Sequence, residues 1–177
     1  MDLGEPEAEL IARLRKGEHE AAVRLLTTYR PLVHAVMFAR CLDLTRAAER
    51  EADVHPKLLV RLTEPSPPAD VAAAVRELAA ACAPPAEEAG PDGDHSLSQT
   101  EKVRVHRAFQ GRVRALPEAD RPLFVLRFVY RLPYAEIARL LGRGLGAVRD
   151  DLQRVHLGLL GEADRLEREE GIAHGLS

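Results

Sequence analysis

The feature that most constrains this chain is a pair of apolar helical patterns separated by glycine, within residues 134–160. Four apolar residues at helical spacing predict the buried face of a first helix: Tyr134, Ile137, Ala138 and Leu141. Gly142 is expected to end this helix, because glycine adopts the left-handed backbone at low cost. A turn over residues 143–146 then leads into a second helix, predicted from about Leu145 to Leu160. Two helices joined by a tight turn form a helix-turn-helix, whose second helix enters the major groove of DNA.

The same apolar spacing also fits a plain helical hairpin inside an all-α core, and the distribution of charge favours the DNA-reading alternative. Residues 97–161 carry 12 Lys and Arg against 6 Asp and Glu, a net charge of +6. Residues 1–96 carry 11 against 17, a net of −6, and residues 162–177 carry 2 against 5, a net of −3. A basic block between acidic segments suits phosphate contacts, because each neutralised phosphate releases counterions.

A longer stretch around these helices carries a recognisable order of residues. It comprises the Leu116-Pro117-Glu118 opening, Leu123 to Phe128, Leu132 to Gly142, and then Gly146, Val148 and Arg149. This order resembles the C-terminal domain of bacterial sigma-70 factors, in particular the extracytoplasmic-function (ECF) type. The resemblance implies that the second helix contacts the −35 promoter element. It also implies core RNA polymerase and promoter DNA as partners, admits an anti-sigma factor as a third, and requires no cofactor.

The second helix and its turn supply the candidate DNA-binding residues. These are Arg143, Arg149, Gln153, Arg154 and His156. Arginine and glutamine can form paired hydrogen bonds with guanine and adenine edges, and an arginine in the turn lies where a phosphate would pass. Alternatively, each arginine is a solvated surface residue or pairs with an acid, and Arg154 is well spaced to pair with Asp150. Asp150 and Asp151 weigh against tight binding, because phosphates repel carboxylates.

The N-terminal part shows three helical patterns. The first covers Glu7 to Lys16, the second runs from Glu18 to about Leu42 through Pro31, and the third covers Arg46 to Leu62 and is expected to be interrupted at Pro56. Residues 9–36, ELIARLRKGEHEAAVRLLTTYRPLVHAV, resemble the N-terminal domain (region 2) of the same sigma family. The resemblance implies that the third helix binds the coiled coil of the largest polymerase subunit. The candidate polymerase-binding residues are Asp53, Val54, Leu58 and Arg61.

The next segment differs from the family. Residues 64–83, EPSPPADVAAAVRELAAACA, contain no aromatic residue, and Arg76 is their only cation. Capturing a melted DNA strand needs aromatic faces for stacking and cations for phosphates. The promoter-melting segment is therefore divergent. A packing helix is predicted instead, capped by Asp70 and ending near Ala83.

The composition of residues 84–96, PPAEEAGPDGDHS, is that of a linker. We therefore predict an all-α fold with two helical domains joined by a flexible linker, the C-terminal one a helix-turn-helix. The predicted boundaries are 1–83 for the region 2-like polymerase-binding domain, 84–96 for the linker and 97–177 for the region 4-like DNA-binding domain.

Other classes of protein find little support. No apolar run approaches 18 residues, so no membrane span is expected. Cys41 and Cys82 are single and far apart, which fits a reducing cytoplasm. The seven histidines lack metal-ligand spacing, and no catalytic motif is present, so we expect neither an enzyme nor a metal site. Two alternatives to a sigma-like initiation factor stay open. One is a degenerate sigma-like interaction module without promoter melting, and the other is a DNA-binding regulator that uses only residues 97–160.

Overall fold

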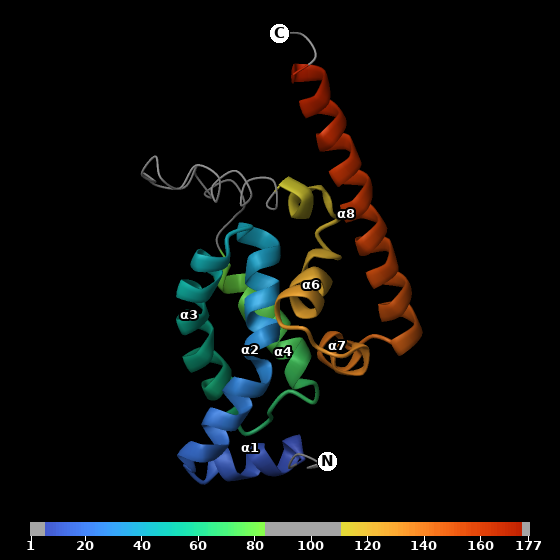
Figure 1. Cartoon of the computed structure of the whole chain (residues 1–177). Coiled ribbons are helices and arrows are strands. Elements are labelled where there is room, and N and C mark those ends of the chain that lie inside the picture. Colours follow the sequence, from blue (N-terminus) through green and yellow to red (C-terminus); the bar gives the residue numbers. More distant parts are fainter. Residues whose placement is uncertain (1–5, 84–110, 175–177) are drawn as a thin grey trace.

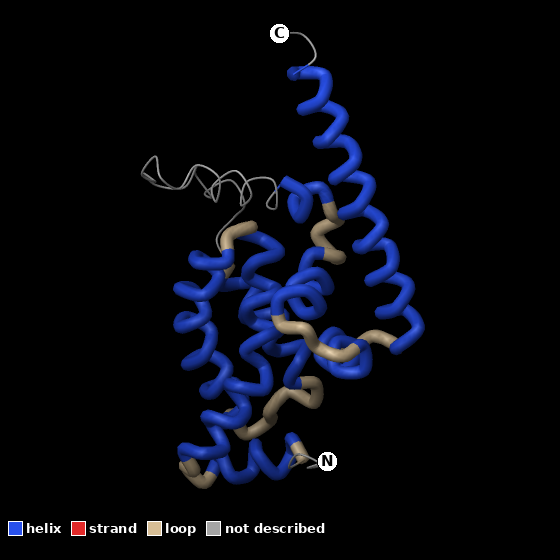
Figure 2. Tube along the Cα trace, viewed as in Figure 1, coloured by secondary structure: helices blue, strands red, loops and turns tan. Residues whose placement is uncertain are grey.

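A computed structural model describes residues 6–83 and 111–174 of the chain, with the backbone alone at 44–45 and 162–174. This part consists of helices and loops without a strand, which confirms the predicted all-α fold (Figure 2). We call residues 6–83 the N-terminal half and residues 111–174 the C-terminal half. The predicted linker at 84–96 lies outside the described residues.

The N-terminal half contains four helices, of which the second is central. They are α1 (Glu7–Arg15), α2 (His19–Cys41), α3 (Leu44–Thr63) and α4 (Val71–Cys82). In Figure 1, α3 and α4 flank α2, and α1 lies across one end of it. Gly17 has a φ of 81° and lies in the turn between α1 and α2. The Asp70 side chain accepts from the Ala73 amide at 2.9 Å, which confirms its predicted capping role.

The interruption expected at Pro56 is wrong, because α3 continues through this residue. A proline inside a helix removes one hydrogen bond. Here the helix is held by a fully buried apolar stripe of Val54, Leu58 and Leu62, each at 0% exposure. Packing therefore outweighs the local cost of the proline. The helix also begins earlier than predicted, and the Asp43 carboxylate accepts from the Arg46 amide at 3.0 Å in its first turn.

The C-terminal half begins with a helical segment at 111–115 and continues through four named elements. They are α6 (Arg121–Phe124), the π-helix η3 (Val125–Val129), α7 (Tyr134–Leu141) and α8 (Leu145–His174). The last helix extends well beyond its predicted end at Leu160. Figure 1 shows it running along the C-terminal half and projecting past the rest of the described chain.

The two halves pack against each other along α2, and one apolar core continues between them. Leu32 and Val33 of α2 belong to the same buried cluster as Leu123 and Leu126 of the C-terminal half. This packing was not predictable from local sequence patterns, because residues on the two faces lie about 90 positions apart. As a result, α2 contributes buried side chains both to its own half and to the contact with the C-terminal half.

Both cysteines are free thiols. Cys41 is buried at the end of α2, and this burial raises the pKa of its thiol. Cys82 is half-buried, and its sulfur lies 3.1 Å from Lys57 Nζ. Within the described ranges, no helix is both long enough and apolar enough to cross a membrane.

Candidate DNA-binding interface

The turn between α7 and α8 has the geometry of a helix-turn-helix connection. Gly142 has a φ of 62°, so a residue without a side chain is favoured there. The Arg143 amide donates to the Ala138 carbonyl at 3.0 Å, which closes the end of α7. The Val148 amide donates to the Gly144 carbonyl at 3.0 Å and begins α8. Three residues, Gly142, Arg143 and Gly144, thus connect the helices.

The buried face of α7 is shifted from its predicted position. Ile137 and Ala138 are buried as predicted, and Leu140 joins them at 0% exposure. Tyr134 is instead 37% exposed, and Leu141 is half-buried. At this surface position the Tyr134 ring makes a cation-π contact, with the Arg127 guanidinium 4.9 Å from the ring centre.

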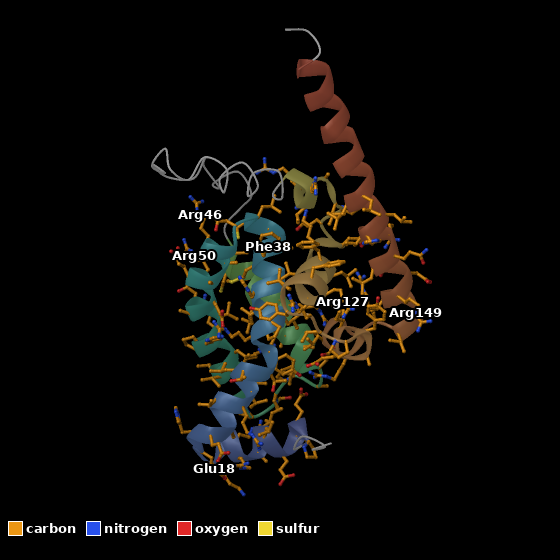
Figure 3. The ribbon with its side chains drawn as sticks, in the orientation of Figure 1. Glu18, Phe38, Arg46, Arg50, Arg127 and Arg149 are labelled. Carbon is orange, nitrogen blue, oxygen red and sulfur yellow. The ribbon has the colours of Figure 1, made fainter. Side chains whose placement is uncertain are left out.

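The first half of α8 has one buried and one exposed face. The apolar spacing predicts a buried face of Ala147, Val148, Leu152 and Val155; the last three are buried, whereas Ala147 is exposed. Farther along, a Cβ on Gly158 would lie 3.4 Å from the Leu116 side chain, so the helix approaches its neighbour closely there. Helical periodicity places five residues on the opposite, solvent-facing side, and all of them are exposed: Arg149, Asp150, Gln153, Arg154 and His156. Figure 3 shows Arg149 on the outer side of α8, away from α6.

A chain of ion pairs fixes α8 to the start of α6. Arg154 Nε lies 3.2 Å from Asp120 Oδ2, and the same guanidinium also contacts Asp151. Asp151 Oδ2 lies 2.8 Å from Arg143 Nη1. Hydrogen bonds to Asp120 and then to Asp151 raise the pKa of Arg154. Asp120 is only 5% exposed, and its carboxylate holds Arg154 without accepting a capping hydrogen bond from α6.

The five candidate DNA-binding residues therefore fall into two groups. Arg143 and Arg154 are engaged by carboxylates, whereas Arg149, Gln153 and His156 form an exposed strip. In the part of the chain that the structure describes, no carboxylate pairs with Arg149. Asp151 is turned toward Arg143 and Arg154, so of these two aspartates only Asp150 faces solvent without an ion pair to a described residue. The exposed strip is consequently more favourable to DNA than the sequence suggested.

The candidate polymerase-binding residues on α3 also divide. The prediction that Val54 and Leu58 contact polymerase is wrong, because both side chains are fully buried in the core. Asp53 and Arg61 are exposed, and they lie near Arg50 and Glu64, with closest N–O distances of 3.4 and 3.1 Å. Sequence reasoning missed Val60, which is 64% exposed.

Val60 lines a shallow groove of about 370 Å³ between α3 and α4. The other residues of this groove are Pro56, Lys57, Arg61, Glu64 and Leu78. An apolar centre with a charged rim is the composition expected of a protein contact.

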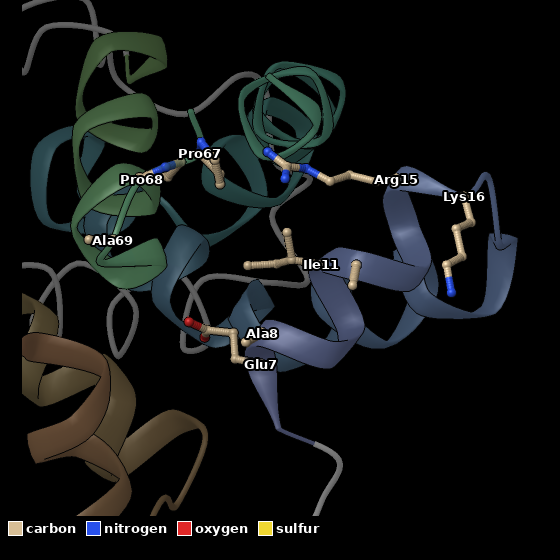
Figure 4. Close-up of a pocket in the computed structure, with 9 residues that line it drawn as sticks. Glu7, Ala8, Ile11, Arg15, Lys16, Pro67, Pro68 and Ala69 are labelled. Carbon is tan, nitrogen blue, oxygen red and sulfur yellow. The ribbon is translucent and has the colours of Figure 1, made fainter. Parts of the chain in front are cut away.

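A second groove, of about 610 Å³, lies between α1 and the loop before α4 (Figure 4). Its polar side chains hold the fold together. Arg15 donates to the Glu64 carbonyl, and Glu7 accepts from the Tyr29 hydroxyl. Burial, followed by the hydrogen bond from Tyr29 to Glu7, raises the pKa of Tyr29 above its ordinary range. The described residues also include no group of three His, Cys, Asp or Glu side chains that could hold a metal ion.

Comparison with known families agrees with this geometry. Residues 102–155 match the family model of Sigma-70, region 4. The match covers 54 of 177 residues, including α6, α7 and the first part of α8. It supports membership of the sigma-70 family. Region 4 is a helix-turn-helix, non-enzymatic domain of transcription factors, and its family binds RNA polymerase core and promoter DNA. None of the curated proteins compared with the chain matches it.

Two residues that sequence reasoning did not assign are structurally important for the helix-turn-helix. Asp120 anchors Arg154 from a position 34 residues earlier in the chain. Arg76, on α4, donates to the Leu140 carbonyl of α7 at 2.8 Å. The only sequence signal for Arg76 was its isolation as the single cation of residues 64–83. Asp120 had no sequence signal for its pairing with Arg154.

Asp120→Ala should loosen α8, because it leaves Arg154 without its buried partner. We expect Tm to fall by a few degrees and amides around 148–155 to exchange faster with deuterium. Asp150→Ala on the same helix is the matched control, since Asp150 is exposed. The control should leave Tm unchanged, and equal Tm values for both variants would contradict the anchoring role of Asp120.

Proposed function

We propose that this chain is a sigma-like transcription factor of the ECF type that binds core RNA polymerase and reads upstream promoter DNA. The observation that carries the proposal is the exposed strip of Arg149, Gln153 and His156 on a helix that follows a helix-turn-helix connection. This strip lies at and beside the end of the segment that matches sigma-70 region 4. The net charge of +6 over residues 97–161 provides the electrostatic attraction to DNA.

Polymerase binding by α3 forms the second part of the proposal. The contact surface consists of Val60, Asp53, Arg61 and the adjoining Lys57. Figure 3 supports simultaneous binding, because Arg50 on α3 and Arg149 on α8 lie at opposite sides of the molecule. A partner on α3 would therefore leave the outer side of α8 accessible. Such a factor acts in the bacterial cytoplasm, and an anti-sigma factor is a further proposed partner.

An adaptor that binds polymerase and DNA without melting promoters is the second candidate, and the surface of α4 favours it. Val71, Val75 and Ala79 of this helix are buried, Glu77 faces solvent, and Arg76 bonds to Leu140. This leaves α4 without an aromatic face or an uncommitted cation for a single strand. Permanganate reactivity of thymines in a complex with core polymerase and promoter DNA separates the candidates. Strand opening supports the conventional sigma factor, and binding without opening supports the adaptor.

Arg149→Ala should weaken binding to a duplex that the wild-type chain selects from a random library. We expect an affinity loss of about tenfold and a decrease of about one in the slope of log K against log salt. Fluorescence anisotropy at several salt concentrations measures both quantities. Arg46→Ala removes an equal charge on the opposite side of the molecule (Figure 3) and should change neither. An unchanged affinity in Arg149→Ala would refute the assignment of α8.

Val60→Asp should weaken binding to core polymerase by about tenfold, because it places a charge in the apolar centre of the proposed contact. Stability should be preserved, since the side chain is 64% exposed. Val23→Asp on α2, where valine is 48% exposed, is the matched control and should bind normally. Surface plasmon resonance with immobilised polymerase gives the affinities. Equal loss in both variants would point to a nonspecific effect of charge.

A further inference from the structure

An arginine from each half donates a hydrogen bond to a carbonyl near the end of a helix in the other half. The last carbonyls of a helix have no amide partner within it and attract cations. Arg76 of α4 donates from Nη1 to the Leu140 carbonyl near the end of α7, at 2.8 Å. Arg121 of α6 donates from Nη1 to the Ala39 carbonyl near the end of α2, at 3.0 Å. Each half therefore caps a helix of the other.

Arg76 is itself held in place and lies against the helix-turn-helix connection. Its Nη2 is 3.6 Å from Asp70 Oδ2, and Asp70 also caps α4. A Cβ on Gly142 would lie 3.6 Å from Nη2 and 3.8 Å from Nη1 of Arg76. The guanidinium thus contacts the last turn of α7 and lies beside the glycine that redirects the chain toward α8.

Further contacts along α2 reinforce this arrangement. His34 Nδ1 lies 2.6 Å from the Tyr130 hydroxyl, and the two rings meet edge to face. The Arg139 guanidinium of α7 lies 5.9 Å from the centre of the Tyr29 ring. Together with the continuous apolar core, these contacts fix the orientation of α7 relative to α2 and α4.

The packing role of α4 explains why this helix is rich in alanine and contains a single cation. Val71, Val75 and Ala79 fill the core, and small alanines allow close packing. Its only cation caps α7. The helix is therefore built to support the helix-turn-helix from the side opposite to the exposed strip.

We propose that α4 is a positioning platform for α8, with Arg76 as the positioning residue. The N-terminal and C-terminal halves then stay together as one rigid body when the chain binds DNA. This inference rests on the proposed reading of DNA by α8. Arg76 contacts no DNA and acts by holding α7 and Gly142, from which α8 departs. The N-terminal half is then part of the DNA-reading unit as well as the polymerase-binding surface.

The test compares full-length Arg76→Ala with Arg13→Ala, using the selected duplex as probe. The side chain of Arg13 is 25% exposed and that of Arg76 30%, but Arg13 pairs with Glu18 and Glu20 inside the N-terminal half. We expect Arg76→Ala to bind about tenfold more weakly and Arg13→Ala to bind normally. The salt slope of Arg76→Ala should equal that of wild type, because no phosphate contact is lost.

Hydrogen exchange provides a readout that does not depend on DNA. In Arg76→Ala, the Arg143 amide and the amides at the end of α7 should exchange faster, while those of α1 keep their wild-type rates. Arg76→Lys retains a donor and should recover much of the affinity. Asp70→Asn keeps the cap of α4 but removes the carboxylate beside Arg76. Asp70→Asn should bind the duplex about threefold more weakly than wild type, and it serves as the test if Arg76→Ala does not fold.

The outcomes separate this inference from the proposed function. If Arg149→Ala weakens binding while Arg76→Ala changes neither affinity nor exchange, the platform is refuted and DNA reading by α8 stands. If Arg149→Ala has no effect, DNA reading itself fails. A salt slope lowered by about one in Arg76→Ala would show a direct phosphate contact and would also overturn the positioning role.

Discussion

The packing of α2 against α6 is the contact on which the rest of the structure depends. It joins the two halves through one apolar core and brings helix ends of each half within reach of arginines from the other. The apolar contact supplies most of the stabilisation, because burial is the dominant favourable contribution to folding. The arginine caps are directional and fix the angle at which the halves meet. The position of α8 therefore depends on residues far away in the sequence.

The inner and outer sides of α8 have different roles. Its inner side is anchored by Val148 and Leu152 and, at the rim, by the ion pairs of Arg154. Its outer side carries Arg149 and Gln153 in solvent. Anchoring one side leaves the other rigid and accessible, which lowers the entropic cost of binding a surface such as the major groove. The two aspartates that counted against DNA binding have different roles, since Asp151 belongs to the anchor and Asp150 faces solvent.

Local features of the fold were predictable from sequence, and contacts between distant residues were not. The helix-turn-helix followed from apolar spacing and Gly142, and the cap of α4 followed from Asp70, because both are governed by neighbouring residues. The continuation of α3 through Pro56 depended on tertiary packing, which outweighs local propensity. Val54 was misassigned because the resemblance to the sigma family indicated which helix to expect at the polymerase contact but not which of its residues the rest of the fold would bury. The pair of Asp120 and Arg154 had no sequence signal.

The central claim is that both halves form one body that persists when DNA binds. Double electron–electron resonance tests it directly, with spin labels at the exposed positions Glu49 of α3 and Leu157 of α8. Cys82→Ser removes the accessible thiol, and Cys41 is 1% exposed and protected from labelling. We predict one narrow distance distribution that stays the same after the selected duplex is added. A broad distribution in the free protein, or a shift on binding DNA, would contradict the account.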